Sequence, residues 1–145
     1  MAIITVRPHL QADLASFHAT DVDARLSIIW QAHQSVGQAF VASLPIALFS
    51  QSVQLLIRQW SQISQEDQLA VLRDILAGAD TRFTQAYKRL NINMKLVFWH
   101  RLLTGHRLDF WLSCCSLTPD HYALLARLSR MDLNERLNFL RCALA

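Results

Sequence analysis

Two histidines stand beside tryptophans in apolar segments, and they are the residues whose chemistry first needs an explanation. His33 follows Trp30 by three residues, and His100 follows Trp99 directly. Two imidazoles that face each other across a helical bundle can ligate a haem or a metal ion. A histidine on a buried face can also be a hydrogen-bonded core residue or the wall of an apolar pocket, and we favour this second interpretation.

The usual catalytic and nucleotide-binding motifs are missing from the chain. The sequence has no glycine-rich phosphate loop, CxxC pair, HExxH or GxSxG motif, and its three glycines could hardly build a loop that cradles an anion. Most acidic residues stand where a helix is expected to begin, so that capping accounts for Asp21, Asp23, Glu66, Asp67, Asp80, Asp120, Asp132 and Glu135. We therefore expect a protein that is not an enzyme.

The composition predicts an all-α fold in one domain. Of the 145 residues, 52% are hydrophobic and 17% are charged, and only three are glycine and three proline. The turn residues that an all-β or heavily looped fold requires are therefore lacking, and the length suits a single hydrophobic core. We expect one helical domain over residues 1–145, in which residues 1–19 form an N-terminal arm or short helix.

Helix start and stop signals divide the chain into about seven or eight short helices. The segments 46–60 and 94–104 carry apolar residues at helical spacing, and the second is apolar almost all round, which predicts a place at the centre of the fold. From 106 to 117 the pattern lapses into a connection. N-cap signals mark the other starts at Thr20 to Asp23, Ser64 to Asp67, Asp80-Thr81, Thr118-Pro119 and Asp132 to Glu135.

The net charge of +3 is unevenly distributed. Residues 1–81 carry four basic and seven acidic residues (net −3), whereas residues 82–145 carry ten and four (net +6). A basic half can serve an acidic protein surface, a nucleic acid or an anionic lipid, so one alternative function is a helical adaptor or nucleic-acid-binding domain. Because the basic residues are scattered among leucines and aromatics, we expect no nucleic acid as a partner.

Several features favour a cytoplasmic protein that is not integral to a membrane. No stretch approaches the roughly 18 consecutive apolar residues that spanning requires. The short apolar run at the start comes before the first charge, Arg7, whereas a secretory signal has the opposite order. Cys114 and Cys115 are adjacent, which is unfavourable for a simple disulfide, so we interpret them and Cys142 as buried thiols of a reducing compartment.

Short segments in a fixed order resemble the amino-terminal domain of orange carotenoid protein. The match covers roughly residues 20–145, in near-constant register up to about Gly105, and as a collinear set it is more specific than any single motif. The matching segments are Leu26 to Trp30, Ser64 to Leu69, Asp80-Thr81, Tyr87, Asn93 to Trp99, Met131-Asp132 and Phe139 to Cys142. The resemblance implies a fold of two interleaved four-helix bundles.

The resemblance also implies a function. Members of the family bind one ketocarotenoid, such as canthaxanthin or echinenone, in an apolar helical tunnel and act in photoprotection, as quenchers of singlet oxygen and of excited phycobilisomes. The chain ends before the family's second, mixed α/β domain could begin, so it resembles the stand-alone helical carotenoid proteins of cyanobacteria and should lack the light switch. We expect a monomer in the cytoplasm, with peripheral thylakoid association and the phycobilisome antenna as a candidate partner.

The family's pigment-lining positions can be carried over residue by residue. The family has tyrosine where this chain has His33 and His100, and methionine where it has Leu72; a histidine keeps a flat ring but adds a titratable group. The arginine that matches Arg141 pairs in two-domain relatives with the other domain or with the antenna. The expected carotenoid site therefore consists of Leu26, Ile29, Trp30, His33, Leu72, Leu96, Trp99, His100, Leu137 and Arg141.

Overall fold

The computed structural model describes residues 8–37, 39–42, 50–105 and 117–145, and every regular element in these ranges is a helix. Eight helices of seven residues or more and one four-residue helix lie in this part, so the all-α prediction is confirmed. They are α1 (Pro8–Ala19), α2 (Val22–Val36), α3 (Ala39–Ala42), α4 (Gln51–Ser61), α5 (Gln65–Ala77), α6 (Arg82–Lys88), α7 (Ile92–Gly105), α9 (Pro119–Ser129) and α10 (Leu133–Ala143).

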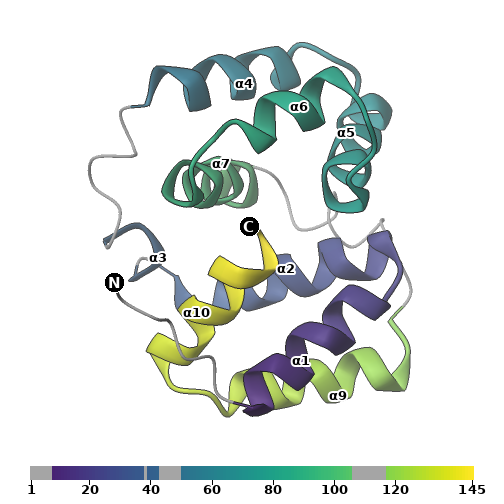
Figure 1. The fold of residues 1–145 in the computed structure, drawn as a ribbon, viewed down its shortest axis with the longest axis vertical. Coiled ribbons are helices and arrows are strands. Elements are labelled where there is room, and N and C mark those ends of the chain that lie inside the picture. The colour runs from purple at the N-terminus through teal and green to yellow at the C-terminus, as the bar shows by residue number, and fades with distance from the viewer. Residues whose placement is uncertain (1–7, 38, 43–49, 106–116) are drawn as a thin grey trace.

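The helices form two groups of four that meet at α2 (Figure 1). In the first group α2 packs against α9 and α10, and α1 packs against the same two helices. The second group consists of α4, α5, α6 and α7, and α2 joins it through contacts with α5 and α7. Because the first group comes from both ends of the chain and the second from its middle, the two groups are interleaved in sequence, as expected.

N-cap side chains begin several helices at the predicted positions. The Asp21 carboxylate accepts a hydrogen bond from the Ala24 N–H at 2.8 Å. Thr118 forms a reciprocal capping box with His121, and Pro119 occupies the first position of α9. Each such cap stabilises its helix by about 1 kcal/mol. The side chains of Ser64, Thr81 and Asp132 cap α5, α6 and α10 in the same way.

Two helices begin at positions other than those predicted. The helix expected over 46–60 begins at Gln51, because Ser50 is its N-cap; residues 46–49 lie outside the described part of the chain. The helix expected over 94–104 begins two residues earlier, because the Asn91 side chain accepts a hydrogen bond from the Met94 N–H at 2.9 Å and serves as a cap. The connection predicted over residues 106–117 lies outside the described residues except for its last position.

The cysteine prediction is only partly testable. Cys114 and Cys115 lie outside the described residues. Cys142 is a free thiol, but it is half-buried and not fully buried as expected. In the described ranges, no helix combines the length and the apolar character needed to cross a membrane.

Helix α7 lies in the interior, as its uniform apolar character predicted. It packs against α2, α3 and α4 (Figure 1). Burial of side chains of this size stabilises a fold by roughly 1.5 to 3 kcal/mol each. The buried side chains of α7 are Leu96, Val97, Phe98, Trp99, Leu102 and Leu103.

An ion pair between the buried Asp13 carboxylate and Arg127 joins α1 to α9. Asp13 is only 4% exposed, and its Oδ1 accepts a hydrogen bond from Arg127 Nε at 2.7 Å. The Phe17 ring also meets Phe139 of α10 edge-on, with 5.7 Å between ring centroids. A carboxylate so far from water requires a partner, because an unpaired buried charge is costly. Residues 8–19 are therefore a packed helix of the first group.

Replacing Arg127 with alanine is expected to lower the free energy of unfolding by about 1 to 3 kcal/mol, because Asp13 loses its partner. The loss of stability should be smaller than for a fully buried ion pair, since the Arg127 side chain is 45% exposed. Urea denaturation at neutral pH measures the change. The matched control is Arg130→Ala, an exposed residue at the end of the same helix, whose effect should stay within about 0.5 kcal/mol. Equal losses in both variants would contradict the dependence of Asp13 on Arg127.

Candidate functional site

A pocket of about 380 Å³ lies between the second half of α2 and the second half of α7. The lining residues of α2 stand at positions i, i+3, i+4 and i+7, and those of α7 at i, i+3 and i+4, so each helix contributes one face. The lining residues are Trp30, His33, Gln34, Gly37, His100, Leu103 and Thr104. None of them carries a permanent charge.

Gly37 ends α2 at the edge of the pocket. Its backbone has φ 53° and ψ −134°, a conformation that residues with side chains rarely adopt. Its N–H donates to the His33 carbonyl and closes the helix. No atom lies within 4 Å of where a Cβ would stand, so the backbone conformation, and not a lack of space, favours glycine here.

The two histidines face each other directly. His33 Nε2 and His100 Nδ1 are 2.9 Å apart and share a hydrogen bond between α2 and α7. The Phe40 ring of α3 packs edge-on against His33, at 5.1 Å between centroids, and stacks on His100 at 5.7 Å. His33 is 3% exposed, and in the described part of the structure its Nδ1 is buried without a hydrogen-bond partner. The pair is thus a polar contact held within an aromatic cluster.

Both histidines are held in the uncharged form. Burial lowers the pKa of His33 to about 4, because an imidazolium loses its hydration there, and the neighbouring His100 adds to the effect. Burial also lowers the pKa of His100, with Arg101 as the second cause. At neutral pH one ring therefore donates the shared proton and the other accepts it.

The two tryptophans expected at the site have different environments. Trp30 is half-buried and forms part of the pocket wall. Trp99 is fully buried, and its Nε1 donates a hydrogen bond to the Tyr87 hydroxyl at 2.9 Å. That hydroxyl in turn donates to the Leu144 carbonyl, and burial raises the pKa of Tyr87. Trp99 therefore connects α7 to α6 and to the end of α10.

The other predicted site residues do not line the α2–α7 pocket. Leu137 and Arg141 are half-buried on α10, which packs against α2. The predicted residues are thus distributed between one pocket, the core and α10, and the pocket includes only three of the ten. The fully packed members are Leu26, Ile29, Leu72, Leu96 and Trp99, which are at most 3% exposed.

Sequence reasoning missed several residues of the site. Phe40 contacts both histidine rings, yet nothing in its local pattern distinguishes it from an ordinary core residue. Leu103 and Thr104 follow His100 by three and four residues, so helical spacing alone could have placed them beside it. The same rule could have found Gln34, which follows Trp30 by four residues.

The arrangement does not favour the haem or metal alternative. His33 Nε2 and His100 Nδ1 are joined by a hydrogen bond, so these two atoms do not flank a space in which an iron could be bound. Across the described ranges, no group of three or more histidine, cysteine, aspartate or glutamate side chains could hold a metal ion. The geometry instead suits an uncharged ligand that packs against flat rings.

The described part of the chain is thus an all-helical domain of two interleaved helical groups, with a pocket between α2 and α7 that the rings of Trp30, His33 and His100 line. Comparison with known families identifies it further. The sequence model of the family described as "Orange carotenoid protein, N-terminal" matches residues 4–145, and the chain belongs to this family. The resemblance noted in the sequence is thereby confirmed.

Two relatives support this membership. An orange carotenoid-binding domain-containing protein of Nostoc sp. is 27% identical over 132 residues, which cover 89% of this chain and 77% of the relative. The orange carotenoid-binding protein of Synechocystis sp. is 26% identical over 91 residues, which cover 63% of this chain and 29% of that longer protein.

Solved structures share the fold. The Red Carotenoid Protein of Anabaena (Nostoc) sp. PCC 7120, which binds a mixture of carotenoids, superposes with a TM-score of 0.75 at 20% identity, over 95% of this chain and 96% of its own. The Orange Carotenoid Protein of the same organism, binding canthaxanthin, gives a TM-score of 0.83 at 22% identity, over 94% of this chain and 45% of its own. The predicted fold class is therefore confirmed by structures as well as by sequence.

Proposed function

We propose that this chain binds one ketocarotenoid, such as canthaxanthin or echinenone, against the wall formed by α2 and α7, and that it acts in photoprotection. Family membership supports the proposal, since two structural neighbours are described as binding canthaxanthin. The observation that carries it in this chain is the α2–α7 pocket, where Trp30, His33 and His100 place flat rings around an uncharged space.

The residues fit an elongated apolar ligand with flat end rings. The α2–α7 pocket, at about 380 Å³, lies within the roughly 300 to 1,000 Å³ of small-molecule sites and is large enough for an end ring. The remaining polyene would need a longer apolar wall, so the packed side chains beside it would have to shift. We assign this wall to Leu26, Ile29, Leu72, Leu96, Trp99 and Leu137, which belong to the same hydrophobic cluster as Trp30.

The histidine pair supports a ligand that carries a carbonyl group. His33 Nδ1 is buried and makes no hydrogen bond with the described residues. A buried polar atom without a partner costs about 1 to 3 kcal/mol, so an oxygen that satisfied it would add to affinity. In the tautomer in which Nδ1 carries the proton, His33 can donate to a carbonyl oxygen, which an unsubstituted carotene lacks.

The proposed activity is physical and breaks no bond. When bound, a conjugated polyene accepts excitation from singlet oxygen or from a bilin of the phycobilisome and releases it as heat. The side chains around the α2–α7 pocket exclude water, hold the rings in one orientation and keep the ligand dispersed. No side chain is assigned the role of an acid, a base or a nucleophile.

Production in two bacterial hosts tests the proposal. Protein from a host that makes a ketocarotenoid should be soluble and orange or red, with about one pigment per chain, whereas protein from a carotenoid-free host should be colourless. The alternative, a helical adaptor or nucleic-acid-binding domain, predicts colourless protein from both hosts and binding to duplex DNA that weakens steeply with salt. Colourless protein that binds DNA would reject our proposal in favour of the alternative.

Arg141 offers a test of antenna docking. It stands in the last turn of α10 and is half-buried, and its side chain forms no ion pair or hydrogen bond with the described residues. If it contacts an acidic antenna surface, the pigment-loaded protein should quench phycobilisome fluorescence at low salt. Quenching should fade near 1 M salt, where the Debye length is about 3 Å. Arg141→Leu, with pigment occupancy checked, should weaken quenching several-fold.

The matched control is Lys88→Leu, which removes an exposed positive charge from α6 in the other helical group. It should leave quenching unchanged. Quenching that survives Arg141→Leu would move the docking surface elsewhere on the protein. If the wild type does not quench at any salt concentration, the antenna role is wrong and quenching of singlet oxygen is the remaining photoprotective function.

A further inference from the structure

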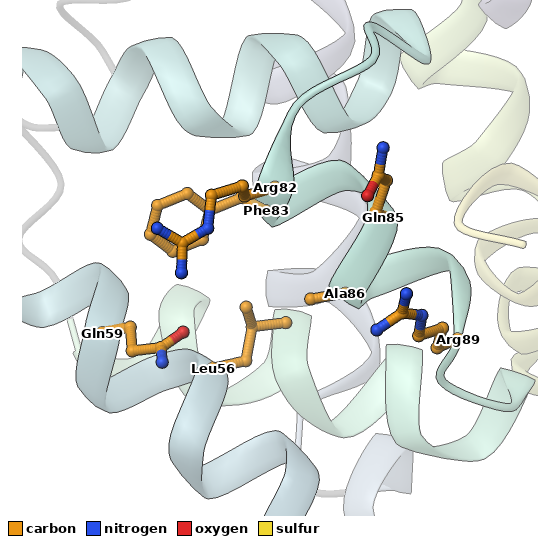
Figure 2. A pocket seen from close by; sticks show the side chains of 7 residues that line it. All are labelled: Leu56, Gln59, Arg82, Phe83, Gln85, Ala86 and Arg89. Atoms are coloured by element: carbon orange, nitrogen blue, oxygen red, sulfur yellow. The ribbon is translucent and has the colours of Figure 1, made fainter.

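A groove of about 630 Å³ lies in the second helical group, between α4 and α6 (Figure 2). Leu56, Phe83 and Ala86 form its apolar floor, with Gln59 and Gln85 beside them. Arg82 and Arg89 stand seven residues apart, which is two helical turns or about 10 Å. In the view of Figure 2 the Arg82 side chain overlaps the Phe83 ring, and Arg89 lies on the opposite side of Leu56 and Ala86.

The two arginines are available to a partner. Both are exposed, and within the described part of the chain neither side chain forms an ion pair or a hydrogen bond. The carboxylate of Asp80 accepts a hydrogen bond from the Gln85 side-chain amide at 2.6 Å and forms no ion pair with either guanidinium group. Two cations beside an apolar floor favour a partner that presents two carboxylates two helical turns apart, with small apolar side chains between them.

Helix α5 of this same chain has such a face. Asp67 is exposed and Asp74 is half-buried, and they too stand seven residues apart. Ala70 and Val71 lie between them at i+3 and i+4, which places all four residues along one side of the helix. Neither aspartate side chain forms an ion pair or hydrogen bond with the described residues.

The two stripes match in pattern and oppose each other in charge. We define the acidic stripe as Asp67, Ala70, Val71 and Asp74, and the basic stripe as Arg82, Gln85, Ala86 and Arg89. Both follow the spacing i, i+3, i+4, i+7, with charges at the ends and small or uncharged residues between. Helices α5 and α6 are neighbours within the chain, yet no ion pair joins the described residues of the two stripes.

We propose that the acidic stripe of a second copy of this chain docks into the groove beside the basic stripe, giving a dimer. Because each copy carries both stripes, a two-fold arrangement makes the contact twice and pairs four arginines with four aspartates. The apolar floor would be covered by Ala70 and Val71 of the other copy, which are small enough to allow the helices to approach closely. The proposed dimer differs from the monomer expected from the sequence, and the proposal is independent of pigment binding.

Charge reversal tests the proposal by sedimentation velocity. The wild type should show a concentration-dependent dimer that weakens near 1 M salt. Arg82→Glu with Arg89→Glu should weaken dimerisation at least about tenfold, since acidic groups would then face acidic groups. Asp67→Arg with Asp74→Arg should do the same for the opposite reason. An equimolar mixture of the two variants should dimerise again, because each contact then joins opposite charges.

Controls separate the contact from general effects of charge and of folding. Lys88→Glu changes an exposed charge of α6 outside the groove and should dimerise as the wild type does. If a charge reversal lowers the melting temperature, a neutral double variant replaces it in the experiment. These variants are Arg82→Gln with Arg89→Gln, and Asp67→Asn with Asp74→Asn. A wild type that stays monomeric up to about 1 mM, or a mixture of the reversed variants that stays monomeric, would overturn the proposal.

Discussion

Replacing Trp30 with alanine is expected to remove most of the bound pigment and to leave the protein folded. Trp30 is half-buried and forms part of the wall of the α2–α7 pocket, so its loss removes a flat surface without opening a void in the fully packed core. The ratio of visible to ultraviolet absorbance, measured after production with a ketocarotenoid, should fall about tenfold, which requires a loss of affinity greater than tenfold because the wild-type site is nearly filled.

Two further variants separate the flat ring from other effects. Trp30→Phe keeps a flat ring and should retain most of the pigment. Gln34→Ala removes an exposed polar side chain from the same pocket and should change the yield little, because the flat rings remain and the ligand's carbonyl oxygen is assigned to His33 Nδ1. Wild-type pigment content in Trp30→Ala would show that Trp30 is not part of the site.

Trp99→Ala is expected to act chiefly on stability. The indole is fully buried and donates a hydrogen bond to the Tyr87 hydroxyl. The substitution therefore opens a cavity and removes a hydrogen bond between α7 and α6. The free energy of unfolding of the pigment-free protein should fall by about 3 to 5 kcal/mol, a large part of the 5 to 15 kcal/mol typical of a domain. Trp99→Phe should cost less, since much of the ring remains. An unchanged denaturation midpoint in Trp99→Ala would contradict this structural role.

Local signals predicted most of the helix boundaries, because capping is a short-range interaction. Asp21 accepts from a backbone N–H three residues ahead, and Thr118 with Pro119 does the same for α9. Such contacts depend on adjacent residues alone, so the sequence is sufficient to place them. The start of α7 was misplaced because the Asn91 side chain can either break a helix or cap one.

The site was less predictable, because it depends on contacts between distant segments. The hydrogen bond between His33 and His100 joins residues 67 positions apart. The sequence suggested that the two rings could face each other as ligands of a haem or a metal ion, but gave no sign that they would bond to each other. The resemblance to a family placed both at a ligand wall, yet it could not distinguish Trp30 at the pocket from Trp99 in the core. That distinction arises from the Tyr87 hydroxyl, which holds Trp99 toward α6.

Mild acid is expected to destabilise the pigment-free protein through His33. The unfolded chain would bind a proton on this histidine near the ordinary pKa of 6.5, whereas the folded protein binds it only near pH 4. Between these values protons bind the unfolded state preferentially, so stability is complete above about pH 6.5 and falls as the pH decreases toward 4. A pKa difference of this size corresponds to about 2 to 3 kcal/mol once partial solvent access is allowed for.

Urea denaturation at pH 7, 5.5 and 4.5 measures this loss. His33→Tyr should lose the part of the dependence that comes from His33, because a tyrosine does not titrate in this range, and should keep the part that comes from His100 and His18, whose pKa values are also lowered by burial. His9→Gln is the matched control, since His9 is exposed on α1 and far in sequence from the pair, and it should retain the dependence. If His33→Tyr lost as much stability as the wild type over this range, the protonation of the unfolded chain at other groups would be responsible. His33 would then contribute to packing and not to the response to acid.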